Sequence, residues 1–153
     1  MDEKVVVIDT IERSKMDDYV ENIEQLLNGR KVDYLVVNHM EPDHTGAIKA
    51  LLCHYPDVKI IGNAKTFPML KNFYGVCENL MEVKEGDSLD LGKHKLNFYM
   101  HRCCTGRKRW LLSNQPKVSC SVVTSSERSE HLTVASLMTR LTWITWKRKS
   151  VAT

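Results

Sequence analysis

The sequence predicts an α/β layered domain over residues 1–100. Short β-branched runs alternate with longer segments whose apolar residues recur at helical spacing, and this alternation is typical of layered α/β folds. Near residue 80 the period changes to two, and turn glycines divide the remaining runs into a strand and a hairpin. The fold class therefore depends on the order of the elements along the chain.

The first strand and the first helix have clear boundary signals. Val5–Ile8 is β-branched and ends at the polar residue Asp9, so we expect a buried strand. Lys15–Leu27 carries apolar residues at helical spacing, with Ser14 as the expected N-cap and Gly29 as the expected stop. The strand would be the first of the sheet, and the helix would be the first to cover it.

The middle of the domain repeats this pattern twice. Tyr34–Val37 is expected to be a second buried strand, and a helix at Thr45–Tyr55 follows it after a polar loop. Val58–Ile61 and Ala64–Phe73 are the third strand and the third helix, and Leu80–Val83 is a fourth strand.

The last elements are expected to be antiparallel. Asp87–Leu91 and Lys95–Tyr99 are strand-like runs with a glycine before the first run and another between the two, which is typical of a hairpin. After Met100 neither the helical nor the strand period continues. We therefore expect one domain at residues 1–100 and an unstructured or non-native segment at residues 101–153.

The charge distribution also changes near residue 100. Residues 1–100 carry a net charge of −5 and residues 101–153 a net charge of +8, and all three tryptophans lie in the second part. A basic segment of this kind suggests a nucleic-acid-binding tail as one interpretation. The other interpretation is that these residues were never selected as protein.

Transport signals and paired cysteines are lacking from the sequence. No apolar run approaches the roughly 20 residues that span a bilayer, and MDEKVVVIDT does not have the form of a signal peptide. The five cysteines show no CxxC spacing, so we expect reduced thiols, with Cys53 and Cys77 in or near the core. The expectation is a soluble cytoplasmic protein with no membrane partner.

The stretch NHMEPDHTG concentrates four metal-capable side chains within six positions after a buried strand: His39, Glu41, Asp43 and His44. Alternate residues of an extended segment point the same way, so we expect His39, Glu41 and Asp43 to converge while His44 faces another side. This arrangement suits two neighbouring metal ions better than one. Asp9 could support the loop as an acceptor behind the metal ligands, and a purely structural role is an equally good interpretation. For the four residues themselves, the alternative is solvated polar side chains in an ordinary connecting loop.

The segment DYLVVNHMEPDHTGAI resembles the metal loop of the flavodiiron proteins (A-type flavoproteins), a branch of the metallo-β-lactamase fold. The similarity continues through KVVVIDTIE, PDVKIIGNAKTFPMLKNFYG and VKEGDSLDLGKHKLNF, and it covers residues 1–100. The resemblance implies a partial metallo-β-lactamase-like αββα sandwich, about one half of the complete fold.

The same resemblance implies a function. His39 and Glu41 would bind one iron, Asp43 and His44 would bind the other, and no catalytic residue is expected beyond these metal ligands. The family reduces O2 to water or nitric oxide to nitrous oxide, with electrons from FMN, a rubredoxin-like donor and a homodimeric assembly. Two alternatives remain: a zinc-dependent hydrolase of the same fold, and a non-enzymatic metal- or nucleic-acid-binding module.

The resemblance stops near Met100. A family member would continue with a His-Trp-Pro-Glu-Thr-Met segment, a Ser-Gly-Asp segment and a flavodoxin-like FMN domain. The codons that can encode HRCCTGRKRW can also be read in a shifted frame, in which each new codon begins at the third base of an old one. In this frame they permit Leu-His-Trp-Pro-Glu-Thr-Met. The codons for CSVVTSSE permit Ser-Gly-Asp in the same frame. We therefore interpret residues 101–153 as the product of one lost base, which disfavours the nucleic-acid interpretation, and we expect this chain alone to be inactive.

Overall fold

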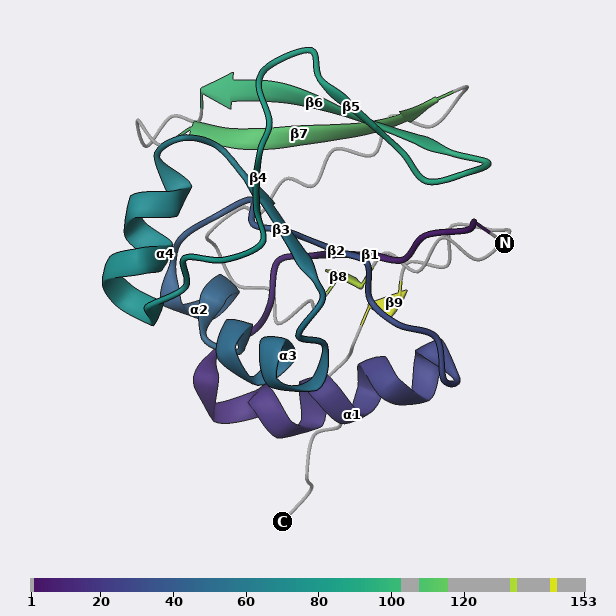
Figure 1. The fold of residues 1–153 in the computed structure, drawn as a ribbon, viewed down its shortest axis with the longest axis vertical. Helices are drawn as coiled ribbons and strands as arrows, with labels where there is room; N and C mark the ends of the chain where they lie inside the picture. The colour runs from purple at the N-terminus through teal and green to yellow at the C-terminus, as the bar shows by residue number, and fades with distance from the viewer. Residues whose placement is uncertain (1, 103–107, 116–132, 135–143, 146–153) are drawn as a thin grey trace.

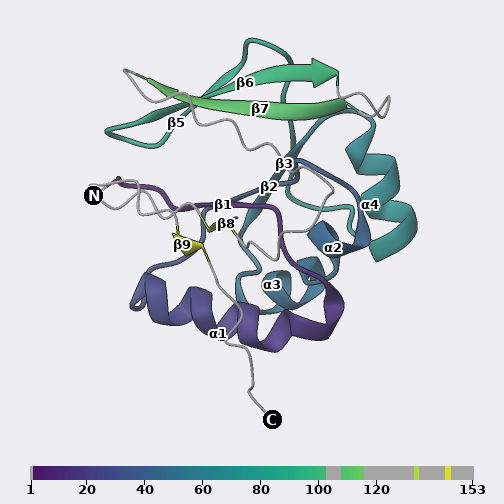
Figure 2. The same cartoon turned by 180° about the vertical axis from the view of Figure 1, so that it is seen from behind.

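The computed structural model describes residues 2–102, 108–115, 133–134 and 144–145. A four-stranded parallel sheet lies at the centre, helices cover one of its faces, and a smaller antiparallel sheet covers the other (Figure 1). The view from behind gives the same three layers (Figure 2). This arrangement confirms the predicted α/β class and corresponds to part of an αββα sandwich.

The larger sheet has the order β1-β2-β3-β4, with every neighbouring pair parallel. Its strands are β1 (Val6–Ile8), β2 (Tyr34–Val36), β3 (Lys59–Gly62) and β4 (Leu80–Glu82). The segments that connect these strands form the turn η1 (Arg13–Lys15) and the helices α1 (Met16–Leu27), α2 (Pro42–Thr45), α3 (Ile48–His54) and α4 (Thr66–Tyr74). Parallel strands require such crossovers, which explains the alternation seen in the sequence.

The smaller sheet has the order β5-β6-β7 and is antiparallel. It consists of β5 (Ser88–Asp90), β6 (Lys95–Arg102) and β7 (Lys108–Gln115), and a separate pair is formed by β8 (Thr133–Val134) and β9 (Ile144–Thr145). Among the described residues, no helix is long and apolar enough to cross a membrane.

Two apolar cores hold the three layers together, because alternate residues of each central strand face opposite sides. Val5 and Val7 pack on the helical side, where they meet Tyr19 and Ile23 of α1. Val6 faces the smaller sheet; the other buried members of that second core are Tyr34, Val36, Ile61, Val83, Leu89, Leu91, Leu96 and Phe98. The continuous apolar character of the central strands thus reflects burial on both faces.

Two details of the predicted helices are wrong. Ser14 is not the N-cap of the first helix, because a 3-10 turn precedes α1 and its N-cap, Lys15, makes no capping hydrogen bond through its side chain. The expected helix Thr45–Tyr55 is two helices, α2 and α3, and the first begins earlier, at Pro42. Proline favours the first turn of a helix, so the break in the extended loop falls there.

Cys53 and Cys77 are exposed, so their predicted burial is wrong. Cys53 lies on the outer side of α3. The residues of this helix that face the core are Ile48 and Leu51. Cys77 follows the end of α4 in a surface connection. Neither thiol contributes to the cores.

The prediction for residues 101–153 mostly concerns residues outside the described part of the chain. Where the backbone is described, it forms the end of β6 and the strands β7, β8 and β9, although the sequence gives no strand signal at these positions. β7 pairs with β6 from Lys95↔Gln115 to Arg102↔Lys108. A strand of this kind depends on the open edge of its partner rather than on its own propensity.

Candidate metal centre

The candidate ligands lie at the carboxyl end of β2, in the loop at residues 37–41 and in the short helix α2 (Figure 1). Ligand sites in open parallel sheets commonly lie at this edge, because the loops there project from adjacent strand ends. β2 has β1 on one side and β3 on the other, so the loop is placed above the middle of the described sheet.

Asp9 holds the start of this loop. It directly follows β1, is 7% exposed, and has a positive φ of 56°. Its Oδ1 accepts hydrogen bonds from the backbone N–H of Asn38 at 2.7 Å and of His39 at 3.2 Å. Asp9 therefore holds the backbone at the start of the loop, which agrees with a structural role, and its support of a bound metal stays a prediction.

The Asp9 backbone is fixed from the helical side. The hydroxyl of Tyr19, a buried residue of α1, donates to the Asp9 carbonyl oxygen at 3.0 Å. Burial, together with the nearby Asp9 carboxylate, raises the pKa of Tyr19 far above its usual value. Tyr19 therefore stays protonated and remains a donor across the physiological pH range.

A second set of contacts holds the far end of the loop. Thr10 donates to the His44 carbonyl oxygen twice, from its backbone N–H at 2.8 Å and from its hydroxyl at 2.9 Å. The Ala47 N–H donates to the Ile11 carbonyl oxygen at 3.0 Å. The chain after β1 thus runs directly against the chain around α2.

Gly46 permits this close approach, as the sequence suggests. A Cβ at this position would lie 2.9 Å from the Glu12 carbonyl carbon and from the Ile11 carbonyl oxygen, and still nearer to the Arg13 nitrogen. These neighbours are backbone atoms, so they cannot rotate away. Gly46 has an ordinary helical φ, and space rather than conformation requires a glycine here.

His39 and Glu41 form the first pair of candidate ligands. Their facing atoms, Nε2 of His39 and Oε1 of Glu41, are 2.8 Å apart. The His39 side chain is 5% exposed and that of Glu41 is 30% exposed, so the imidazole is buried and the carboxylate lies at the surface end. This pair agrees with the alternation expected for an extended segment.

Asp43 and His44 form the second pair, and the expected convergence of Asp43 with His39 and Glu41 is wrong. Asp43 and His44 belong to α2, whose start at Pro42 ends the alternation. The His44 Nε2 lies 3.6 Å from the Asp43 Oδ2, and its Nδ1 lies 3.6 Å from the Asp9 Oδ2.

The two pairs are neighbours. The rings of His39 and His44 have centroids 5.6 Å apart and meet edge to face. Each pair offers one imidazole nitrogen and one carboxylate oxygen, a donor set that suits iron and is also compatible with zinc. Within the described part of the chain, no three His, Cys, Asp or Glu side chains converge as a metal site. Each pair therefore brings two possible donor atoms together.

Sequence reasoning missed several residues that hold this loop. Thr10 and Tyr19 are among them, as are Thr45 and Tyr74, whose hydroxyl oxygens lie 2.7 Å apart. Thr45 also donates to the Glu41 carbonyl oxygen at 2.9 Å. Thr10 and Thr45 adjoin Asp9 and His44 in the sequence, which is the only signal available for them, and nothing in the sequence indicates Tyr74.

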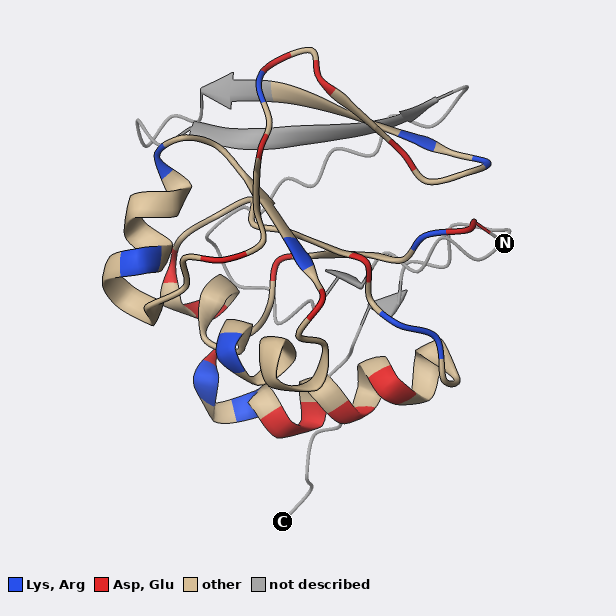
Figure 3. Ribbon diagram, viewed as in Figure 1, with Lys and Arg blue, Asp and Glu red and all other residues tan. Residues whose placement is uncertain are grey.

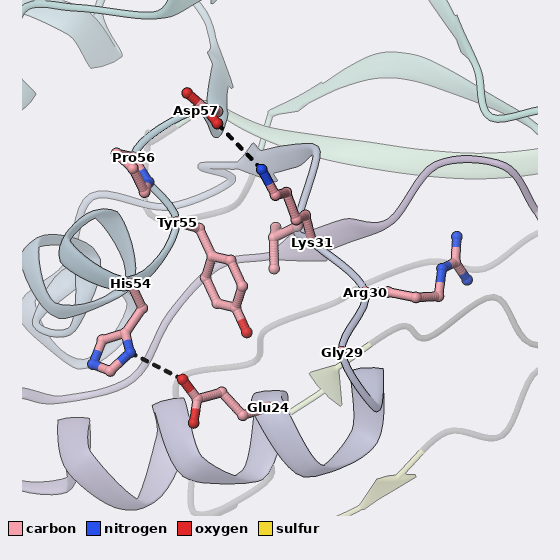
Figure 4. Close-up of a pocket in the computed structure, with 9 residues that line it drawn as sticks. Glu24, Gly29, Arg30, Lys31, His54, Tyr55, Pro56 and Asp57 are labelled. Atoms are coloured by element: carbon pink, nitrogen blue, oxygen red, sulfur yellow. Dashed lines mark hydrogen bonds and ion pairs between the residues drawn. The ribbon is translucent and has the colours of Figure 1, made fainter.

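A cavity of about 370 Å³ lies elsewhere, beside the end of α1 and the turn after α3 (Figure 4). It is near the amino ends of β2 and β3, and none of the candidate ligands lines it. Among its lining side chains, Glu24 and His54 share a hydrogen bond at 3.0 Å, and Lys31 and Asp57 form an ion pair at 3.7 Å. This cavity is therefore not part of the candidate metal centre.

The charged residues of the described part are distributed unevenly (Figure 3). Acidic residues follow the outer side of α1, including Asp17 and Asp18 in its first turn. The basic residues that suggest a nucleic-acid partner follow residue 101, and the structure does not describe their side chains. That alternative therefore stays a prediction from sequence.

Residues 1–105 match the protein family described as "ODP family beta lactamase". A relative named putative diflavin flavoprotein A 1 from Thermosynechococcus vestitus is 37% identical over 99 residues, which are 64% of this chain and 17% of the relative. A nitric oxide reductase from Moorella thermoacetica is 35% identical over 99 residues, 64% of this chain and 25% of the relative. The chain thus spans about a quarter or less of the length of these relatives.

Solved structures show the same likeness. A flavoprotein from Thermotoga maritima is similar with a TM-score of 0.60 and 28% identity, over 65% of this chain and 25% of that chain. The rubredoxin oxygen:oxidoreductase from Desulfovibrio gigas gives a TM-score of 0.60 and 30% identity, over 65% of this chain and 25% of that one.

Proposed function

Because this chain belongs to the ODP family of beta-lactamase domains, found in flavodiiron proteins, we propose that it supplies part of a non-haem diiron site. His39 and Glu41 would hold one iron, and Asp43 and His44 would hold the other. The reaction of the complete site would be the reduction of O2 or nitric oxide. The observation that carries this proposal is the presence of two adjacent His–carboxylate pairs at the carboxyl end of β2.

The residues of this chain would act by holding donors in place. Asp9 fixes the peptide that carries His39, and the burial of His39 restricts its ring to few orientations. Carboxylate oxygens are hard ligands that suit iron in both of its common oxidation states. When bound, the irons would supply the electron-transfer chemistry, and the loop would keep them side by side.

The electrons would come from outside the described residues. Relatives are named as flavoproteins, and one is the anaerobic nitric oxide reductase flavorubredoxin of Escherichia coli. We therefore propose FMN as the electron source, a rubredoxin-like protein as its donor and a homodimer as the working assembly.

This chain alone would hold metal weakly and would not catalyse the reduction. The candidate loop offers two donors for each ion, whereas metal sites in proteins usually have three or four protein ligands. We expect iron or zinc below two ions per chain after desalting, and no consumption of O2 or nitric oxide with a reduced donor.

The test is a metal titration of the full chain with Fe²⁺ and Zn²⁺, followed by elemental analysis. His39→Ala and Asp43→Ala should reduce binding, and His54→Ala, an exposed histidine paired with Glu24, is the matched control. Equal binding by all three variants would contradict the assignment of the loop, and two tightly held irons per chain would contradict weak binding. A preference for zinc with esterase activity would instead support a hydrolase.

A further inference from the structure

Tyr74, the last residue of α4, contacts the metal loop through Thr45 of α2. The two hydroxyl oxygens are 2.7 Å apart, and the Thr45 hydroxyl donates to the carbonyl oxygen of Glu41 at 2.9 Å. Thr45 is fully buried and Tyr74 is half-buried. Both views place α4 beside α2, so this contact joins two neighbouring helices (Figures 1 and 2).

The direction of these hydrogen bonds follows from the available protons. A carbonyl oxygen can only accept, so the single hydroxyl proton of Thr45 is committed to Glu41. The 2.7 Å contact then requires Tyr74 to be the donor and Thr45 the acceptor. The result is a directed chain in which Tyr74 donates to Thr45, and Thr45 donates to Glu41.

This series of hydrogen bonds ends at the Glu41 carbonyl, where the loop changes from an extended to a helical conformation. Glu41 is the N-cap of α2 with extended backbone angles, and Pro42 begins the helix. The Glu41 carbonyl oxygen also accepts the His44 N–H at 2.9 Å. Its peptide therefore joins the extended pair, His39 and Glu41, to the helical pair, Asp43 and His44.

We propose that Tyr74 is a positioning residue for the metal loop, because its hydroxyl sets the angle between the two ligand pairs through Thr45 and the Glu41 carbonyl. The proposal rests on the proposed function for the statement that the loop binds metal. The ordering of the loop by Tyr74 does not depend on metal and can be measured separately.

The first experiment measures Co²⁺ binding by the full chain, because Co²⁺ reports its coordination through visible absorption. Tyr74→Phe removes one hydroxyl and keeps the ring, which packs beside the helical core. We expect the Co²⁺ dissociation constant to rise about 3- to 10-fold, the factor that corresponds to one lost hydrogen bond. The absorption spectrum of the bound ion should also change, which loss of packing alone would not cause.

Matched variants separate the hydroxyl from general effects. Tyr55→Phe removes a hydroxyl at the cavity near the opposite edge of the sheet and should leave Co²⁺ binding unchanged. Thr45→Ser keeps the relay and should bind as the parent does, whereas Thr45→Val should weaken binding. Adding Tyr74→Phe to Thr45→Val should have no further effect, because the two residues act in series.

The second experiment is amide hydrogen exchange on the metal-free chain. Tyr74→Phe should speed exchange at the His44 amide, which is bonded to the same carbonyl oxygen, several-fold more than at the amides of β2. Unchanged exchange at His44 would overturn the proposal even if the parent chain binds no Co²⁺. Failure of the parent chain to bind Co²⁺, with faster exchange in the variant, would instead contradict the proposed function alone.

Discussion

At the scale of single residues, the loop and helix α2 that carry the candidate ligands are held mainly by groups that are not candidate ligands. Asp9 accepts two backbone N–H groups of the loop, Thr10 donates twice to its far end, and Gly46 lets the two segments touch. Asp9 and Gly46 could be predicted because each adjoins a recognisable element. Tyr74 could not, because its contact with Thr45 spans 29 residues and depends on how α4 packs.

Replacing Asp9 tests its role as an acceptor. Asp9→Ala leaves the Asn38 and His39 amides without their carboxylate and places alanine at a positive φ, so we expect a loss of about 3 kcal/mol in unfolding free energy. Asp9→Asn keeps an acceptor oxygen and tolerates this backbone conformation, so its loss should be about 1 kcal/mol. Urea denaturation in the presence of a chelator measures both. Equal losses would contradict the account.

Replacing Gly46 tests the close approach of the two segments. Gly46→Ala should cost about 3 kcal/mol, because the added methyl group meets backbone atoms that cannot move aside. Gly29→Ala is the control, since a Cβ there meets nothing within 4 Å and only the positive φ of 86° opposes it. Its cost should be about 1 kcal/mol. Thermal or urea unfolding that ranks the two variants in the opposite order would contradict the packing argument.

At the scale of elements, the sequence predicts the type and order of every strand and helix through residue 100, apart from the 3-10 turn and the division of one helix at α2. The spacing of apolar residues and the positions of turn residues are local properties, so they can be read from a single sequence. Helix α2 was missed because four residues give no periodicity, although Pro42 marks its start. β7 was missed because its partner is the open edge of β6.

Helix α1 gives a prediction about pH. Burial and the Asp9 carboxylate raise the pKa of Tyr19, so the folded chain keeps the phenol protonated where an unfolded chain ionises it. The contribution of Tyr19 to stability is therefore complete below about pH 10, the ordinary tyrosine pKa, and falls above it by up to about 1.4 kcal/mol per pH unit. Tyr19→Phe should flatten this part of the profile.

The measurement is the unfolding free energy between about pH 8 and pH 11 for the parent chain and Tyr19→Phe, a range that brackets the ordinary tyrosine pKa. Tyr99→Phe, at a side chain that is 43% exposed, is the matched control and should keep the parent profile. Parallel profiles for the parent chain and Tyr19→Phe would show that Tyr19 ionises equally in both states.

At the scale of the whole molecule, three layers are present, and the candidate metal loop lies at the carboxyl edge of the central one (Figure 1). The described helices cover one face of that layer, and the β5–β7 sheet covers the other. The division into residues 1–100 and residues 101–153 stays a prediction from charge, composition and codon pattern. A genetic experiment can decide it.

We predict that inserting one base after the Met100 codon restores an open reading frame. It should continue through His-Trp-Pro-Glu-Thr-Met and Ser-Gly-Asp into a flavodoxin-like FMN domain, because codons of the present sequence permit both segments in one frame. The restored protein should bind two irons and FMN, and should consume O2 or nitric oxide with a reduced donor. Sequencing of the coding DNA comes first, and stop codons before the Ser-Gly-Asp segment would refute the single-base explanation.

The Asp9 contacts have a further consequence, for the order of folding. Asp9 is 29 and 30 residues away from the amides that it binds, and Thr10 is 34 residues away from its acceptor. Such distant partners meet only after the intervening chain has closed, which is slow compared with the formation of a helix. The loop should therefore become ordered together with the pairing of β1 and β2 and later than the helix between them.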